Sequence, residues 1–278
     1  MIDKISFKNY KSFRDQQELE LKPITVLIGK NNSGKSAIAK LPTLIENSLS
    51  GSFNEPLLLN HHGIELGAEF RDLIYGRTLA GSLDLELEDQ NEKLKLSIAC
   101  GTGTKDLPQI VYWELRKSLD VVSEKQPSKN FKGFKYQSTD PNYQIRSLNL
   151  NTEFIGPFRK LPQRDYRRSS ITIDKLGSEG EFTYPLLIED ALTTEELLIR
   201  RISAWYQSNF EGWGLRVNKD RDPIYQIELT RDSGRLNINI RDVGEGISQA
   251  LPLVTIAFMP VLEETLIIIE QPELHLHP

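Results

Sequence analysis

The sequence lacks the features of several protein classes. It has one cysteine, Cys100, so no internal disulfide can form. It also lacks an apolar run of about 20 residues, which a membrane-spanning helix requires, and its start, MIDKISFKNY, has no apolar signal segment. Positive charge is not in excess, because the formal net charge is −5. We therefore expect a cytoplasmic protein without membrane contact, on which nucleic acid could bind only at a local patch.

Apolar spacing indicates a folded protein with both strands and helices. Of the 278 residues, 38% are apolar and 26% are charged, which is enough to bury a core. The apolar patterns predict strands near Lys4–Phe7, Glu18–Leu21 and Thr25–Ile28, a helix over 37–49, a hairpin over 82–99, an exposed loop over 123–143, a helix over 193–210 and a second hairpin over 225–240.

The string GKNNSGKS at residues 29–36 matches the phosphate-binding pattern G-x-x-x-x-G-K-[ST]. In such a loop the glycines let backbone N–H groups surround a β-phosphate, and the following helix directs its positive end at the anion. Lys35 would bridge the β- and γ-phosphates in a catalytic role, and Ser36 would bind Mg²⁺. The expected nucleotide contacts are Gly29, Asn31, Asn32, Ser33, Gly34, Lys35, Ser36 and Ala37.

The apolar segment LIIIE, residues 266–270, predicts a strand that delivers Glu270 to a nucleotide-bound metal. Strands of a parallel sheet gather their ligands at their carboxyl ends, so this acid pairs naturally with the phosphate loop. An ordinary buried strand ending in a surface acid is the alternative.

Two further segments carry candidate contacts. The turn RDVGEGISQALP, residues 241–252, places Gly246, Ser248 and Gln249 before an apolar helix, where free N–H groups suit an anion or where the loop is only structural. The basic run from Arg159 to Arg168 suits nucleic-acid phosphates or a solvated loop. Arg159 follows the strand end FIGP, and we expect it near the nucleotide.

Together, LIGKNNSGKSAI after ISFKNYKSF, the turn DVGEGISQALP and the end LIIIEQPELHLHP resemble the ABC-type ATPases of the RecF, SMC and OLD branch, in particular prokaryotic defence-associated AAA proteins. FIGPFRKLPQRDY and GSEGE extend the resemblance. It implies an α/β P-loop NTPase of ABC-ATPase type, a mixed core sheet with an antiparallel β lobe and a helical insertion. The expected head has parts 1–70, 71–235 and 236–278, and it is C-terminally incomplete because such heads continue further.

The resemblance also implies how the site works. Two copies face each other and enclose two ATP molecules with Mg²⁺, and Gly246 and Ser248 of one copy cap the γ-phosphate held by the other. We therefore expect a homodimer or a higher homo-oligomer that regulates a partner effector, such as a nuclease, in anti-phage defence. Full OLD-type proteins append a nuclease domain, which this sequence lacks.

Gln271 stands where related ATPases place a second acid. An amide cannot take a proton from water, although a glutamine can orient the attacking water, so we expect slow turnover. Glu273, His275 or His277 could supply the base instead. Two alternatives stay open: the ATPase part of a DNA-processing enzyme that binds DNA through Arg159–Arg168, and a nucleotide-gated scaffold without turnover.

Overall fold

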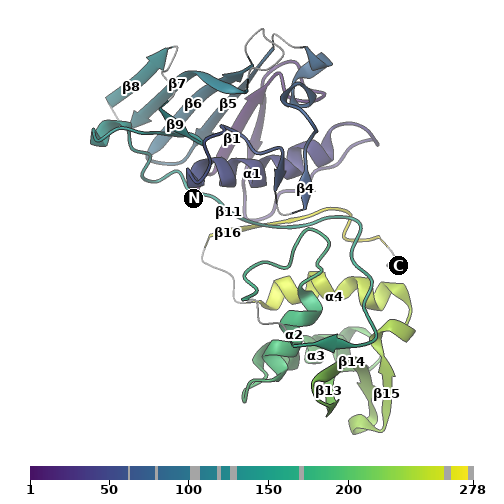
Figure 1. Ribbon diagram of the computed structural model, residues 1–278. Coiled ribbons are helices and arrows are strands. Elements are labelled where there is room, and N and C mark those ends of the chain that lie inside the picture. Colours follow the sequence, from purple (N-terminus) through teal and green to yellow (C-terminus); the bar gives the residue numbers. More distant parts are fainter. Residues whose placement is uncertain are drawn as a thin grey trace. The chain divides into compact units, whose positions relative to one another are not determined.

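The chain folds into two compact units. The computed structural model describes residues 1–61, 63–78, 81–100, 107–117, 120–125, 130–168, 172–259 and 264–274. The N-terminal unit comprises Met1–Thr152 and Glu264–Leu266, and the C-terminal unit comprises Glu153–Glu263 and Ile267–Pro278. The boundary expected after residue 70 falls inside the first unit, and that expected after residue 235 falls inside the second. The chain passes between the units within two paired strands, β11 (Asn151–Ile155) and β16 (Thr265–Ile269) (Figure 1).

An antiparallel six-stranded sheet is the centre of the N-terminal unit, in the order β2-β1-β5-β6-β7-β8. Its strands are β1 (Lys4–Lys8), β2 (Gln17–Glu20), β5 (Ser82–Glu88), β6 (Glu92–Ala99), β7 (Gln109–Lys117) and β8 (Asp120–Lys125). Apolar side chains alternate with polar ones along β5 and β6, and the leucines of both strands are buried. The expected hairpin over 82–99, with one face toward the core, is confirmed.

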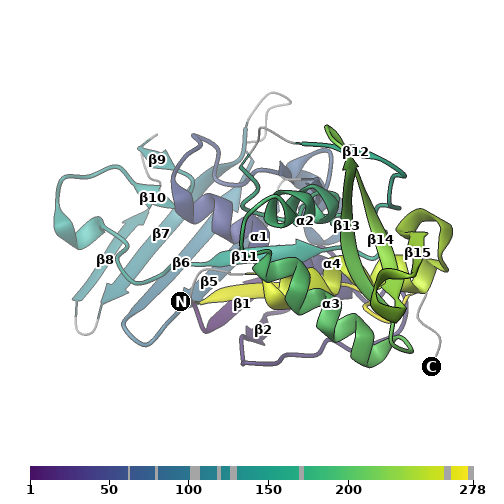
Figure 2. The ribbon, with the colours of Figure 1, turned by 90° about the horizontal axis from the view of Figure 1, so that it is seen from below.

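Helix α1 (Lys35–Ser50) lies against one face of this sheet (Figures 1 and 2). Leu41, Leu44 and Ile45 are buried in the same hydrophobic cluster as the sheet residues, because they recur at helical spacing. The helix continues through Pro42, as expected. The shorter elements of this unit are β3 (Asn60–His61), β4 (Ile64–Glu65), β9 (Phe131–Lys132), β10 (Lys135–Tyr136) and the 3-10 helices η1 (Phe70–Leu73), η2 (Tyr75–Arg77) and η3 (Pro141–Tyr143).

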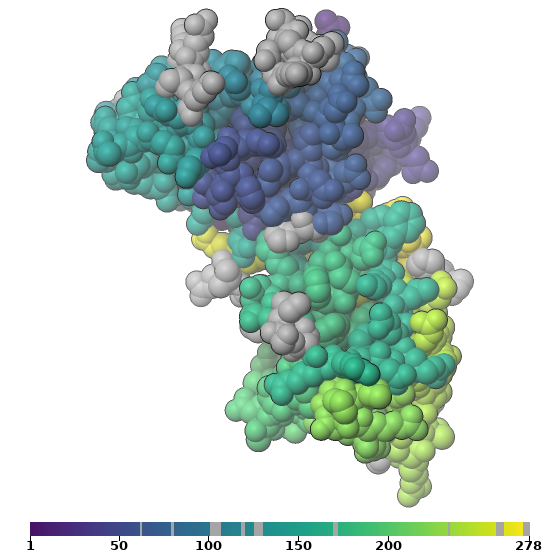
Figure 3. All heavy atoms as spheres, in the orientation of Figure 1, coloured from purple at the N-terminus to yellow at the C-terminus, as the bar shows by residue number. Residues whose placement is uncertain are grey.

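The strand expected at Thr25–Ile28 is not formed. Ile24, Val26 and Ile28 are 84%, 71% and 91% exposed, and no neighbouring strand pairs with them in the part of the chain that is described. Purple atoms, from the first part of the sequence, project at one edge of this unit in Figure 3. The apolar alternation has strand character, but a strand needs a hydrogen-bonded neighbour. Without one the prediction was wrong.

The exposed loop expected over 123–143 is also partly wrong. Strand β8 extends to Lys125, and β9, β10 and η3 follow in the described residues from 130 onward. Phe134 is fully buried, and its carbonyl accepts a hydrogen bond of 3.1 Å from the indole nitrogen of Trp113. Trp113 also stacks on Tyr143 with ring centres 6.1 Å apart. These aromatic contacts outweigh the Lys, Ser and Gly content that predicted a solvated loop.

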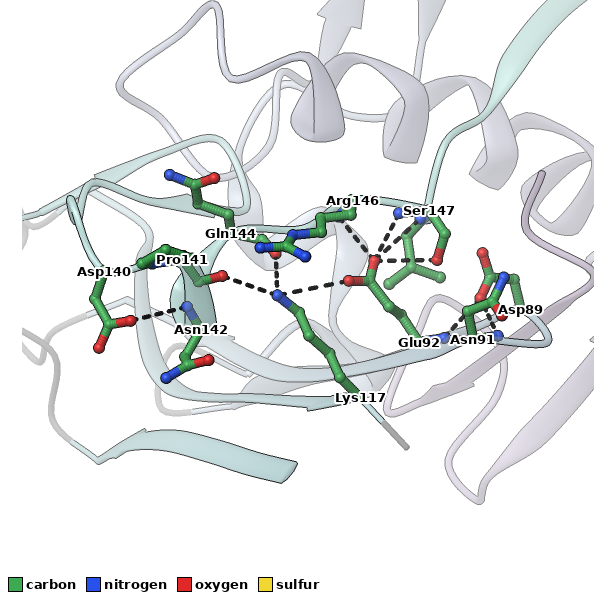
Figure 4. A network of polar contacts seen from close by, with 11 residues as sticks. Asp89, Asn91, Glu92, Lys117, Asp140, Pro141, Asn142, Gln144, Arg146 and Ser147 are labelled. Atoms are coloured by element: carbon green, nitrogen blue, oxygen red, sulfur yellow. Dashed lines mark hydrogen bonds and ion pairs between the residues drawn. The ribbon is translucent and has the colours of Figure 1, made fainter. Parts of the chain in front are cut away.

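A buried carboxylate anchors the segment that follows (Figure 4). Glu92, 5% exposed, accepts hydrogen bonds of 2.8 Å from the backbone nitrogens of Arg146 and Ser147 and one of 3.1 Å from the Ser147 hydroxyl. The ammonium of Lys117 lies 3.7 Å from the other carboxylate oxygen and donates to the Gln144 carbonyl at 2.5 Å. The carboxylate therefore supplies the acceptor that these backbone N–H groups need.

We expect Glu92→Ala to destabilise the protein by about 3 kcal/mol, because it leaves buried donors without an acceptor and Lys117 without its acid. The midpoint and slope of a urea unfolding curve measure the change. The matched control is Glu88→Ala, which removes an acid that is ion-paired with Lys93 at 2.9 Å on the same hairpin and is 36% exposed. It should cost less than about 1 kcal/mol. Equal losses in the two variants would contradict the anchoring role of Glu92.

The C-terminal unit combines a small antiparallel sheet with three helices. Strand β14 (Ile224–Arg231) lies between β12 (Tyr166–Arg167) and β13 (Gly214–Arg221), and β15 (Leu236–Asn239) also pairs with it. The helices α2 (Thr183–Ala191), α3 (Leu197–Asn209) and α4 (Glu245–Phe258) lie beside this sheet and share its core (Figure 2). The 3-10 helices are η4 (Asp232–Gly234) and η5 (Ile240–Asp242). The second hairpin, with its turn at 232–234, is confirmed. The helix expected over 193–210 forms, but it begins only at Leu197, so the threonine cap and the early acids lie before it.

The described residues thus form a mixed α/β fold with four α-helices. None of these helices combines the length and the apolar character that crossing a bilayer would require.

Candidate functional site

The phosphate-binding pattern of the sequence occupies the turn that opens α1. Gly34 is the residue that caps this helix, with φ 93° in the left-handed region. A side chain at this position would place its Cβ 2.6 Å from the Ser12 hydroxyl and 2.7 Å from the Phe13 ring. Only glycine therefore suits the turn, both for its backbone angle and for its space.

The first turn of α1 is tied to the sheet beneath it. The buried Tyr10 hydroxyl donates a 3.0 Å hydrogen bond to the Ala37 carbonyl, and Ala37 packs against the core of the unit. Burial raises the pKa of Tyr10 above its ordinary value, so the hydroxyl stays protonated and keeps donating. Sequence reasoning missed this anchor, although Tyr10, Ser12 and Phe13 all lie in the KNYKSF string that supports the family resemblance.

Lys35 folds back onto its own loop. Its ammonium donates to the carbonyls of Gly29 at 2.8 Å and Lys30 at 2.7 Å. The loop residues Gly29 to Ser33 are exposed, as is Ser36. The ammonium therefore lies within the loop that would surround a phosphate, with its charge compensated by two carbonyl dipoles.

Backbone donors at the start of α1 are available. The N–H groups of Gly34, Lys35 and Ser36 donate to no other residue among those described, whereas Ser33 donates to Lys30 and Ile38 to Gly34. Free N–H groups and the helix dipole together favour an anion at this end of a helix. The loop can therefore bind a phosphate group by its backbone and neutralise it with Lys35.

The acidic segment lies in the C-terminal unit, at the end of β16. The backbone nitrogen of Glu270 donates to the Ile155 carbonyl of β11 at 2.9 Å, which holds the residue at the end of the strand pair. One carboxylate oxygen of Glu270, Oε1, is buried and has no hydrogen-bond partner in the described structure. A buried carboxylate oxygen without a partner is costly, and a hard cation or a water is what would satisfy it.

The residues after Glu270 form a tight turn. Gln271 has φ 46°, in the left-handed region, and its carbonyl accepts a 3.1 Å hydrogen bond from Leu274. Gln271 and Glu273 are exposed. His275 and His277, the other base candidates, lie outside the described residues.

Arg159 reaches this turn from a different part of the chain. Its terminal nitrogen Nη2 donates to the carbonyls of Glu270 at 3.2 Å and Gln271 at 2.8 Å. The side chain is 6% exposed. Burial lowers the pKa of this guanidinium below its ordinary value, and the charge of Glu273 opposes the shift. An arginine nevertheless stays charged. The structure places this charge beside the main chain of Glu270.

The glycine turn becomes the start of α4. Gly244 precedes the helix, so Gly246 lies in its first turn. The Ser248 hydroxyl donates to the Glu245 carbonyl at 3.0 Å and the residue is 3% exposed, so its side chain turns toward its own helix. The side-chain nitrogen of Gln249 donates to the Arg159 carbonyl at 3.2 Å. Within the C-terminal unit the structure thus brings Gln249, Arg159, Glu270 and Gln271 together.

The arginines between Arg159 and Arg168 differ in burial and in ion pairing. Arg159 is buried, whereas Arg164 forms a two-pronged ion pair with Asp242, at 2.9 Å and 2.5 Å. Arg168 lies 3.3 Å from Glu189. These contacts reduce the positive charge that the run presents to solvent.

Two known families match parts of the chain. A family described as "AAA ATPase domain" matches residues 1–177, more than half of the 278 residues, and includes the phosphate loop and Arg159. The chain belongs to this AAA ATPase family. Residues 147–278 match a second family, described as "AAA domain, putative AbiEii toxin, Type IV TA system". No curated protein matched the sequence.

Membership of the AAA ATPase family indicates nucleotide binding and ATP hydrolysis, usually with Mg²⁺. The two matches overlap at residues 147–177, which contain Arg159 and β11. The phosphate loop of this AAA ATPase lies in the first match alone, and Glu270 and α4 lie in the second alone.

Proposed function

We propose that this AAA ATPase binds ATP and hydrolyses it slowly. The observation that carries the proposal is the loop before α1: three backbone N–H groups that have no acceptor among the described residues, a glycine that tolerates no side chain and the ammonium of Lys35. A triphosphate supplies the negative charge that this arrangement leaves unmatched. On binding, Lys35 exchanges its two carbonyl partners for phosphate oxygens.

Ser36 of the phosphate loop and Glu270 at the end of β16 are each proposed as an oxygen donor to Mg²⁺. A hydroxyl and a carboxylate are the hard oxygen donors that this ion prefers, and the unpartnered Oε1 of Glu270 supports its share. A bound Mg²⁺ would supply positive charge to the phosphate oxygens, which would favour displacement at the γ-phosphate. The backbone donors of the loop hold the phosphates in position meanwhile.

Slow turnover follows from Gln271. Its amide cannot accept a proton from water, and loss of a positioned base costs on the order of 10²- to 10⁴-fold in rate. Glu273 and His275 are the alternative bases, because they follow on the same turn. Glu273 is exposed, so its carboxylate is in water. It could act as the base only in a complex in which the bound nucleotide covers it.

We also propose that two copies enclose ATP and that the dimer controls an effector in anti-phage defence. The exposed start of α4, at Gly244 and Glu245, supports a backbone contact from one copy to the γ-phosphate of the other. Ser248 would have to turn outward to join it. The second family is described as a "putative AbiEii toxin" of a type IV toxin–antitoxin system, and this description supports a defence role with a partner.

The DNA-processing alternative has less support, since Arg159 is buried and Arg164 and Arg168 are paired with acids. A salt-sensitive DNA affinity would restore it. The scaffold alternative differs from our proposal only in turnover, which a rate measurement decides.

The test of the proposed function combines mass and rate. We expect light scattering to show a dimer with Mg²⁺ and ATP and a monomer without nucleotide, together with a slow steady-state release of phosphate. The same assay on Gln271→Ala, Glu273→Gln and His275→Ala should slow the rate in the variant that removes the base. A mass unaffected by ATP contradicts the dimer, absent phosphate release favours the scaffold, and equal rates in all three variants exclude these residues as the base.

A further inference from the structure

We propose that Arg159 is a positioning residue that holds the Glu270–Gln271 turn by its carbonyls and couples it, through Gln249, to helix α4. The sequence had suggested a direct contact between Arg159 and the nucleotide. The inference rests on the proposed function for its consequence, although its geometry does not depend on it.

The guanidinium of Arg159 is used for backbone carbonyls. It donates to Glu270 at 3.2 Å and Gln271 at 2.8 Å from the same terminal nitrogen. Burying an arginine to 6% exposure without a direct ion pair among the described residues is expensive. This cost is expected where the arginine has a role, and its hydrogen bonds indicate that the role is to hold the main chain of Glu270 and Gln271. The delocalised charge of a guanidinium is more weakly hydrated than that of a lysine ammonium, so an arginine is the cation better suited to this buried position.

The Glu270–Gln271 turn has a backbone conformation that would not persist without contacts from other residues. Gln271 has φ 46°, and a residue other than glycine persists in this region only where its surroundings hold it. On the other side, the nitrogen of Glu270 is bonded to the Ile155 carbonyl at 2.9 Å. The main chain of Glu270 is thus fixed at both its N–H and its carbonyl, and the carboxylate is aimed by it.

Gln249 extends this arrangement to α4. It is 3% exposed, and its side-chain nitrogen donates to the carbonyl of Arg159 at 3.2 Å. The buried oxygen atom of Gln249 and the Nε of Arg159 have no partner among the described residues. A shift of the first turns of α4 would therefore move Arg159, and with it the turn that carries Glu270.

Two measurements on the full chain test the proposal. The first is hydrogen exchange of the backbone N–H groups at residues 268–274 without nucleotide. Arg159→Ala and Gln249→Ala should both speed the exchange of the Glu270 N–H, and Arg164→Ala, an arginine of the same loop that is paired on the surface with Asp242, should not. Unchanged exchange in the first two variants overturns the proposal whether or not ATP binds.

The second measurement is the Mg²⁺ concentration that gives half of the metal-dependent rise in ATP affinity. Arg159→Ala should raise it by about 10-fold, the usual effect of losing a residue that orients a metal ligand, and should leave ATP affinity in EDTA unchanged. Arg159→Lys should lie between this variant and the wild type, since an ammonium keeps a cationic donor for the carbonyls but is more strongly hydrated and therefore harder to bury. The double variant Arg159→Ala with Gln249→Ala should raise the half-maximal Mg²⁺ concentration little beyond the value of Arg159→Ala alone. Both substitutions interrupt the same series of hydrogen bonds, so their effects should not add.

The opposite pattern identifies a nucleotide contact. If Arg159→Ala weakens ATP in EDTA and leaves the Mg²⁺ requirement unchanged, the arginine binds phosphate and the proposal is wrong. Should Arg159→Ala fail to fold in a thermal unfolding scan, Arg159→Lys and Gln249→Ala carry both tests. A wild type that binds no ATP removes the proposed function, while the exchange experiment still decides the positioning role.

Discussion

Lys35→Ala should lower the affinity for ATP by about 100-fold or more. The ammonium forms charge-assisted hydrogen bonds, each worth about 1.5–3 kcal/mol, and about 3 kcal/mol corresponds to roughly 100-fold in affinity. In the free protein Lys35 donates to the Gly29 and Lys30 carbonyls. Binding therefore exchanges two neutral acceptors for charged phosphate oxygens, which are the stronger partners. Isothermal titration with ATP in EDTA measures the loss.

The control for this variant is Lys30→Ala. It removes the same charge from the same exposed loop, so long-range attraction falls equally in the two variants. Because the Lys30 carbonyl, and not its side chain, contacts Lys35, affinity should fall by no more than about threefold. Retained ATP affinity in Lys35→Ala would overturn the assignment of the loop as a phosphate-binding site. Equal losses of affinity in Lys35→Ala and Lys30→Ala would show that Lys35 contributes only through its net charge.

Glu270→Gln should lower turnover at saturating Mg²⁺ and ATP by about 100-fold, equivalent to about 3 kcal/mol of barrier. The substitution keeps the shape of the side chain and removes its charge. Since Oε1 has no hydrogen-bond partner among the described residues, loss of the charge breaks no hydrogen bond of this oxygen, so stability should change little. Affinity for ATP in EDTA should be unaffected, because Glu270 is proposed to act through the metal ion, which EDTA removes.

Glu264→Gln is the matched comparison for this second variant. Glu264 precedes β16 as Glu270 follows it, is 62% exposed and lies 2.9 Å from the N-terminal ammonium. Its removal should change turnover by less than about twofold. Wild-type turnover in Glu270→Gln would show that this carboxylate has no part in the reaction.

Local sequence patterns predicted the elements whose formation depends on residues close together in the sequence. The alternation of leucines over 82–99 predicted a hairpin with one buried face, since a period of two admits no other arrangement. The phosphate-binding string predicted a turn that opens a helix, and Gly34 occupies it in the left-handed conformation that glycine allows. These elements follow from backbone geometry over a few residues.

Contacts between distant residues were not predictable in the same way. The strand expected at Thr25–Ile28 lacks a neighbour among the described residues, and no local pattern shows whether a neighbour is present. The expected loop over 123–143 contains the buried Phe134, whose carbonyl accepts a hydrogen bond from Trp113 of β7, 21 residues earlier in the chain. Composition describes a segment's own side chains and not the partners that enclose it.

The sequence by itself determined the residues on which the proposed chemistry depends: the phosphate-binding string at 29–36, an acid at 270 and an amide at 271. These features depend on residue type and close spacing. Only the tertiary structure decided what Arg159 does. It is 111 residues from Glu270 along the chain, and its hydrogen bonds to the carbonyls of Glu270 and Gln271 arise from folding alone. A backbone carbonyl is present at every position, so no sequence pattern marks the two that a buried arginine will hold.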